Sequence, residues 1–123
     1  MTYLKHFKIF IFPGLFCFII GCAGFQDGSQ SAPSALYNKG IRLVNKGHYE
    51  EAKEIFHQYI AEYPDSHLYL VSLYQLGFCY QKLGDTKQAL TIYHKVLDED
   101  AQDFWGQMAQ KRIKEMETSA GEN

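Results

Sequence analysis

The side chains that could do chemistry are scattered along the chain and form no catalytic pattern. The four histidines downstream of residue 21 (His48, His57, His67 and His94) never have the i, i+4 spacing of a helical metal site. No Ser-His-Asp or Cys-His arrangement and no glycine-rich phosphate loop occurs at a suitable spacing. The acidic run 98–100 lacks the ligand periodicity and glycine of a calcium loop, and a solvated loop with a helix N-cap is favoured. We therefore expect no enzyme activity, no metal and no cofactor.

The three cysteines are too few for a disulfide framework, and their spacing matches no zinc motif. Cys79 lies two residues after Gly77 in a stretch with helical periodicity, so a buried, inert thiol is favoured over a reactive one. Cys17 lies inside an apolar run, and Cys22 directly follows that run. The role of these two cysteines therefore depends on the N-terminal segment.

The first 21 residues have the three-part layout of a secretory signal. Residues 1–8 are basic, residues 9–20 are apolar, and Gly21-Cys22-Ala23 follows. At about 1.5 Å per helical residue, the apolar run is too short for the roughly 30 Å hydrocarbon core of a bilayer. A cleaved signal is therefore favoured over a permanent transmembrane helix.

The string Ile19-Ile20-Gly21-Cys22 resembles the lipobox of bacterial lipoproteins. The resemblance implies cleavage after Gly21 and diacylglycerol on the Cys22 thiol, with acylation of the new amino group. Stable anchoring needs more than one acyl chain, which this chemistry would supply. The following Ala23 points to an outer-membrane lipoprotein facing the periplasm, because lipoproteins kept in the inner membrane often have Asp there. The inner membrane, and a simple cleaved signal in which Cys22 is incidental, stay open.

Beyond the signal, the chain divides into a tether and a region that repeats itself. Residues 22–33 are rich in Gly, Ser and Gln, which predicts a flexible tether. The motif Leu36-Tyr37-x-x-Gly40 then recurs 37 residues later as Leu73-Tyr74-x-x-Gly77. The other pairs at this offset are Leu43 with Tyr80, Gly47 with Gly84, Ala52 with Ala89, Phe56 with Tyr93, and His57 with His94. Each copy predicts a helix, a glycine turn and a second helix.

The predicted domain is all-α and occupies residues 34–117, with a disordered tail at 118–123. Gly47 and Gly84 suit the left-handed position after a helix, and Asp85 with Gln88 predicts a capping box. An apolar stripe that includes Trp105 predicts a closing helix. The helices of the two copies are expected at about 34–46, 49–62, 67–83 and 86–98.

The repeat resembles the tetratricopeptide repeat (TPR). Gly40 and Ala52 in the first copy, and Gly77 and Ala89 in the second, match the small residues where that family's paired helices pack closely. The resemblance implies a short helix-turn-helix solenoid of two full repeats plus a C-terminal capping helix. The long repeat and its Tyr-Pro junction are similar to TPR proteins of the bacterial envelope, of the kinds associated with Tol-Pal and the barrel-assembly machinery. The second copy departs from the pattern, with Ala101 in place of Pro64.

The same resemblance implies a binding face. TPR proteins bind extended or helical segments on a concave face lined mainly by the first helix of each pair. Carried over to this chain, that face comprises Tyr37, Ile41, Val44, Tyr74, Phe78, Gln81 and Lys82. Exposed apolar and aromatic groups there would form a patch typical of an interaction site. Coverage of the face by the tether or by a second copy is the alternative.

Together these features predict a membrane-anchored scaffold or adaptor that binds protein partners in the bacterial cell envelope. Residues 22–123 carry 10 basic and 14 acidic side chains, which does not favour nucleic acid. A structural lipoprotein that mainly homo-oligomerises stays open, because stable solenoids usually need about three repeats. An envelope hydrolase is disfavoured, since the sequence has no suitable polar cluster.

Overall fold

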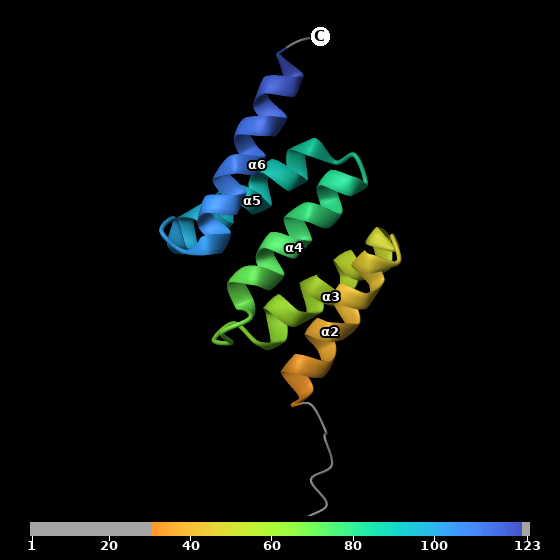
Figure 1. The fold of residues 1–123 in the computed structure, drawn as a ribbon. Coiled ribbons are helices and arrows are strands. Elements are labelled where there is room, and N and C mark those ends of the chain that lie inside the picture. The colour runs from red at the N-terminus through yellow and green to blue at the C-terminus, as the bar shows by residue number, and fades with distance from the viewer. Residues whose placement is uncertain (1–30, 122–123) are drawn as a thin grey trace, which may run out of the picture.

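The computed structural model describes residues 31–121, and the expected all-α solenoid is confirmed (Figure 1). The signal, Cys22 and most of the tether lie outside the described residues. Among residues 31–121, no helix is long and apolar enough to cross a membrane. The helices are α2 (Ala32–Asn45), α3 (Tyr49–Glu62), α4 (Tyr69–Lys82), α5 (Thr86–Asp100) and α6 (Phe104–Ala120).

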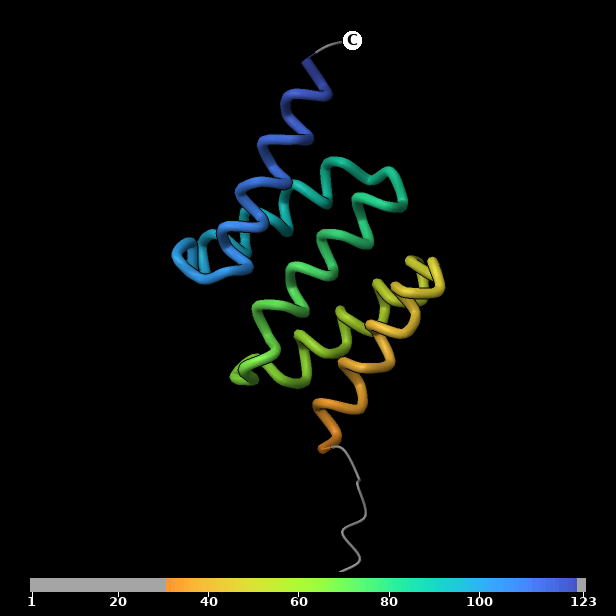
Figure 2. Tube along the Cα trace, in the orientation of Figure 1, coloured from red at the N-terminus to blue at the C-terminus, as the bar shows by residue number. Residues whose placement is uncertain are grey.

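The helices stack in chain order, and each packs on the next. Helix α4 also contacts α6, the first helix after its own pair. Figure 2 shows α2, α4 and α6 on one side of the stack, with α3 and α5 on the other. We call the side formed by α2, α4 and α6 the groove face, and the side formed by α3 and α5 the back face. The molecule is thus two helix pairs closed by a single helix.

Local chemistry explains where the helices turn. Gly47 and Gly84 end α2 and α4 with φ of 76° and 81°, in the left-handed region that glycine adopts without a Cβ clash. Asp85 Oδ1 accepts the Gln88 N–H at 3.1 Å, which is one half of the expected capping box. Asp103 caps α6, because its carboxylate accepts the Trp105 N–H at 2.9 Å.

Several predicted boundaries are corrected. Helix α2 begins at Ala32, inside the expected tether, because Pro33 suits a first helical turn. Helix α4 begins at Tyr69 and not at residue 67, since Ser66 Oγ accepts the Leu68 N–H and holds a turn there. Helix α5 runs through residues 98–100, which were expected to form a loop. Residues 118–120, expected in the tail, continue α6, and Thr118 Oγ1 donates to its preceding turn.

The two helix pairs are built around the same contact between an aromatic ring and a glycine. A Cβ placed on Gly40 would lie 2.8 Å from Phe56 Cζ, and one on Gly77 would lie 2.8 Å from Tyr93 Cε1. Both rings are fully buried, as are Ala52 and Ala89. The absence of a side chain on each glycine therefore allows the helices of a pair to approach closely.

The core runs the length of the stack as two connected clusters. One is centred on α2 to α4 and includes Phe56, Leu76 and Cys79. The other is centred on α4 to α6 and includes Tyr93 and Ile113. Ile60, Tyr80 and Ile92 pack against both clusters. Burial of apolar side chains, at roughly 1.5–3 kcal/mol for each large one, thus joins successive repeats into one domain.

One close approach has no counterpart in the sequence repeat. A Cβ on Gly106 would lie 2.0 Å from the Asp100 carbonyl oxygen, where α5 turns into α6. The positions 37 residues earlier and 74 residues earlier hold Tyr69 and Ala32, so comparison of the copies does not reveal this requirement. The α5–α6 turn is therefore packed by a contact between glycine and backbone that the other turns do not share.

Gly77→Ala should destabilise the protein. Overpacking against the buried Tyr93 ring costs about 1–3 kcal/mol, and the better helix propensity of Ala offsets at most about 1 kcal/mol. Urea unfolding followed by circular dichroism measures the difference. Gly121→Ala is the control, because the nearest atom to its new Cβ would be 3.7 Å away. Equal stability of Gly77→Ala and the parent would show that the contact is loose.

The Cys79 thiol should be inert in the folded protein. Burial raises its pKa to about 12, which keeps the reactive thiolate scarce near neutral pH. At about pH 8, iodoacetamide should leave Cys79 unmodified in the native protein and alkylate it after urea unfolding. Mass spectrometry of the peptide that contains Cys79 separates it from the other two cysteines. Equal labelling in both states would contradict the buried position.

Candidate partner-binding face

Phe78 lies on α4, the middle of the three groove-face helices, and is only half-buried. Its ring meets that of Tyr49 edge-on, with centroids 6.1 Å apart. Lys82 Nζ lies 5.3 Å from the Phe78 ring centroid, and Arg112 Cζ lies 6.0 Å from it. Side chains from α3, α4 and α6 therefore converge on one accessible aromatic ring with two cations beside it.

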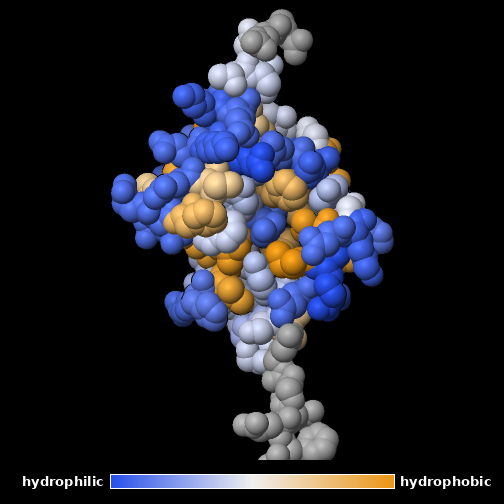
Figure 3. Space-filling model, viewed as in Figure 1, coloured by the Kyte–Doolittle hydropathy of each residue, from blue (hydrophilic) through white to orange (hydrophobic). Residues whose placement is uncertain are grey.

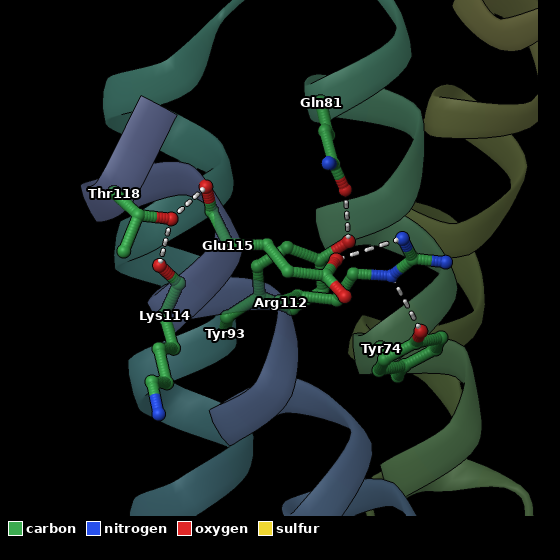
Figure 4. A network of polar contacts seen from close by, with 7 residues as sticks. All are labelled: Tyr74, Gln81, Tyr93, Arg112, Lys114, Glu115 and Thr118. Carbon is green, nitrogen blue, oxygen red and sulfur yellow. Dashed lines mark hydrogen bonds and ion pairs between the residues drawn. The ribbon is translucent and has the colours of Figure 1, made fainter. Parts of the chain in front are cut away.

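Arg112 connects α6 to α4 on this face (Figure 4). Its Nε donates to the Tyr74 hydroxyl at 3.3 Å, and its Nη1 lies 3.3 Å from Glu115 Oε2. The hydrogen bond to Tyr74 is the largest cause that raises the pKa of Arg112, so the guanidinium is always charged. Sequence reasoning did not include Arg112 in the face, because it belongs to the incomplete third copy.

Tyr74 is corrected from a groove residue to a core residue. It is only 5% exposed, because α6 covers it. Its ring packs against Trp105 at 5.1 Å and against Tyr93 at 5.5 Å between centroids. A partner on the groove face cannot contact this ring, so Tyr74 acts by holding Arg112 in place.

The Gln81 side chain makes a hydrogen bond within the protein. Its Oε1 accepts the Tyr93 hydroxyl proton at 2.9 Å, which ties α4 to α5 (Figure 4). Burial is the main cause that raises the pKa of Tyr93 above its usual value, so the hydroxyl stays a donor. Gln81 is half-buried and therefore borders the groove face while supporting the core.

The α2 side of the groove face is apolar and partly accessible. Tyr37, Ile41 and Val44 are half-buried and pack on the cluster that contains Phe56. The Tyr37 ring contacts that of Phe56 at 6.2 Å, and burial raises the Tyr37 pKa. Figure 3 views this face and shows apolar side chains gathered across its middle, with hydrophilic residues along the edges. Of the seven predicted residues, Ile41, Val44, Phe78 and Lys82 fit a contact surface best.

The side of α2 turned away from the stack is polar. Lys39 and Arg42 are exposed there. They precede by 37 residues Leu76 and Cys79, which are buried against α3 in the second repeat. The first repeat thus has charged residues where the second has apolar residues that pack on the preceding helix. The outer side of α2, at the start of the solenoid, is therefore suited to contact with solvent.

Other clusters do not suggest chemistry. His57 is exposed, and its Nε2 lies 2.9 Å from the Tyr80 hydroxyl, an arrangement that ties α3 to α4.

Among residues 31–121, no group of three or more His, Cys, Asp or Glu could hold a metal ion. Two surface cavities of about 390 and 340 Å³ lie beside the start of α2 and beside the end of α6. The second is lined only by Gln81, Thr86, Met116, Ser119 and Ala120, with no ionisable group among them.

Comparison with known proteins agrees with this geometry. No curated protein matches the chain. The tetratricopeptide repeat family matches residues 43–113, which run from α2 into α6 and make up more than half of the chain. Repeats of this family typically form non-catalytic scaffolds for protein–protein interaction. With its paired helices, its ring-on-glycine contacts and this match, the chain belongs to the tetratricopeptide repeat family.

Proposed function

We propose that this protein is a lipid-anchored scaffold of the bacterial cell envelope that binds a segment of a partner protein on its groove face. The observation that carries the proposal is the half-buried Phe78, flanked by Lys82 and Arg112 on a face whose middle is apolar. Interfaces gain most of their binding energy from a few such aromatic and cationic side chains.

The proposed contact surface spans two repeats. Ile41 and Val44 lie on α2, while Phe78 lies one repeat further along on α4. A bound segment would cross from one helix to the other, and its affinity would depend on both repeats being correctly stacked. Contacts that join the repeats, such as the pair His57 and Tyr80, would then support binding without touching the partner.

The lipid anchor in this proposal rests on the sequence of residues 1–23. A basic start, a short apolar run and Ile19-Ile20-Gly21-Cys22 together support lipidation of Cys22. Ala23 supports the outer membrane, with the domain in the periplasm. Anchoring would confine the groove face to the membrane surface and raise its effective concentration toward partners there.

Self-association as the main function has less support. A solenoid that pairs through its ends needs apolar ends, whereas α2 exposes Lys39 and Arg42 on its outer side. On α6, the residues Gln107, Gln110, Lys111 and Lys114 are also exposed. We therefore favour binding of a different protein over stacking of identical copies.

Phe78→Ala should abolish capture of the partner while the protein stays folded. The change removes the central aromatic contact, and truncation of such a residue typically weakens binding by 2 kcal/mol or more. Crosslinking in cells followed by affinity purification measures the partner recovered. Phe104→Ala is the matched control, because Phe104 is 61% exposed and its ring packs edge-on against that of Trp105, away from Phe78 in the sequence. Unchanged recovery with Phe78→Ala would place the interaction elsewhere.

Cys22→Ser should remove the lipid. A serine hydroxyl cannot form the thioether to diacylglycerol, so metabolic labelling with a radioactive fatty acid should fall to background. Membrane fractionation should show the same variant released or retained only by an uncleaved signal. Cys17→Ser, within the apolar run, is the control and should keep its label. Label that persists in Cys22→Ser would reject the lipoprotein assignment.

A further inference from the structure

The helices on the two sides of the stack differ in their content of charged residues. Helices α2, α4 and α6 contain six basic and two acidic residues, whereas α3 and α5 contain three basic and seven acidic residues. The acidic residues of the back-face helices are Glu50, Glu51, Glu54, Glu62, Asp98, Glu99 and Asp100. The overall charge of −2 conceals this difference. Two of the basic residues, Lys82 and Arg112, lie beside Phe78 on the groove face, where their charge would attract anionic groups.

Of the two cations beside Phe78, Arg112 is paired with Glu115, whereas Lys82 takes part in no ion pair among residues 31–121. Helices α2 and α4, which border the apolar surface, contain no acidic residue. Within residues 31–121, the ion pairs join His48, Lys53 and Arg112 to nearby glutamates, and none includes Lys82. Lys82 is exposed and lies over the Phe78 ring. An incoming carboxylate could therefore reach an available ammonium group at the edge of the apolar contact.

We infer that the segment bound on the groove face is an acidic peptide with apolar side chains, an inference that rests on the proposed function. Its apolar groups would pack on Phe78, Ile41 and Val44. Its carboxylates would meet Lys82 and Arg112, whose guanidinium makes one hydrogen bond to Tyr74 and one pairing with Glu115. Arg112 can thus donate hydrogen bonds to a further carboxylate, because a guanidinium has five N–H donors.

Charge also argues against the N-terminal segment of this chain as the occupant. Residues 1–30 contain Lys5 and Lys8 and a single acid, Asp27, so they do not complement a basic face. The acidic back face of a second copy does complement it. That arrangement, and an anionic membrane, are therefore outcomes that the experiment must separate from an acidic peptide.

The test uses three labelled peptides of equal length in which Leu alternates with Glu, Gln or Lys. Fluorescence anisotropy with the full-length protein in a neutral detergent measures their affinities. The Glu peptide should bind tightest, and rising salt should weaken it. Lys82→Gln should weaken the Glu peptide about fivefold, as expected for one exposed ion pair, and leave the Gln peptide unchanged. Lys95→Gln, an exposed lysine of α5 on the back face, should change neither.

Each alternative gives a different result. If the Gln peptide binds as tightly as the Glu peptide and Phe78→Ala weakens both, the groove function stands and the acidic partner is wrong. If no peptide binds in a Phe78-dependent manner, the groove function itself fails. Self-association in sedimentation that Lys82→Gln removes would identify a second copy as the occupant. A Lys82-dependent preference for anionic over neutral vesicles, without preference among the peptides, would identify a lipid surface. Both of these results overturn the inference.

Discussion

The fold depends on an aromatic ring packed against a glycine backbone, a contact made once in each helix pair. Phe56 on Gly40 and Tyr93 on Gly77 set how closely paired helices approach. That spacing in turn places the next helix, because successive repeats share the core residues Ile60, Tyr80 and Ile92. The groove-face side chains of α2 and α4 are therefore positioned by helices whose separation these two contacts determine.

The closing helix α6 does more than cover the end of the core. Trp105 and Arg112 enclose Tyr74, so a residue that would face the groove in an open repeat becomes part of the interior. Arg112 also brings a permanent cation to Phe78. A short solenoid thus obtains a composite surface, since the half-buried ring comes from one repeat and one of its two cations from the helix that ends the stack.

The charged residues beside the apolar surface would decide which partners it prefers. The back-face helices hold seven of the nine acidic residues that lie in helices, and some of these pair locally, as Glu50 does with Lys53. The groove face combines the cations of Lys82 and Arg112 with apolar side chains across its middle. Apolar burial supplies affinity with little selectivity, whereas charge selects among partners and speeds their encounter. A protein tethered to a membrane, as we propose, would use both properties in a crowded compartment.

The sequence alone determined the elements and their repetition, because these follow from local and periodic features. Glycines at Gly47 and Gly84, small residues at Gly40 and Gly77, and apolar spacing at 3.6 residues were enough to place five helices within a few residues. Ile41, Val44 and Phe78 are half-buried and Lys82 is exposed, which is compatible with a contact surface. Their role in binding, like the lipid anchor at Cys22, stays a prediction from sequence.

Only the tertiary structure decided the burial of Tyr74, the place of Arg112 beside Phe78 and the close packing of Gly106. Each depends on contact with a different helix: Tyr74 and Arg112 meet although 38 residues separate them, and Gly106 lies against the end of α5. Tyr74 and Tyr37 occupy equivalent positions in the repeat, yet Tyr74 is covered by α6 and Tyr37 is half-buried. Repetition in a sequence specifies which residues are equivalent, whereas exposure depends on what packs beyond each repeat.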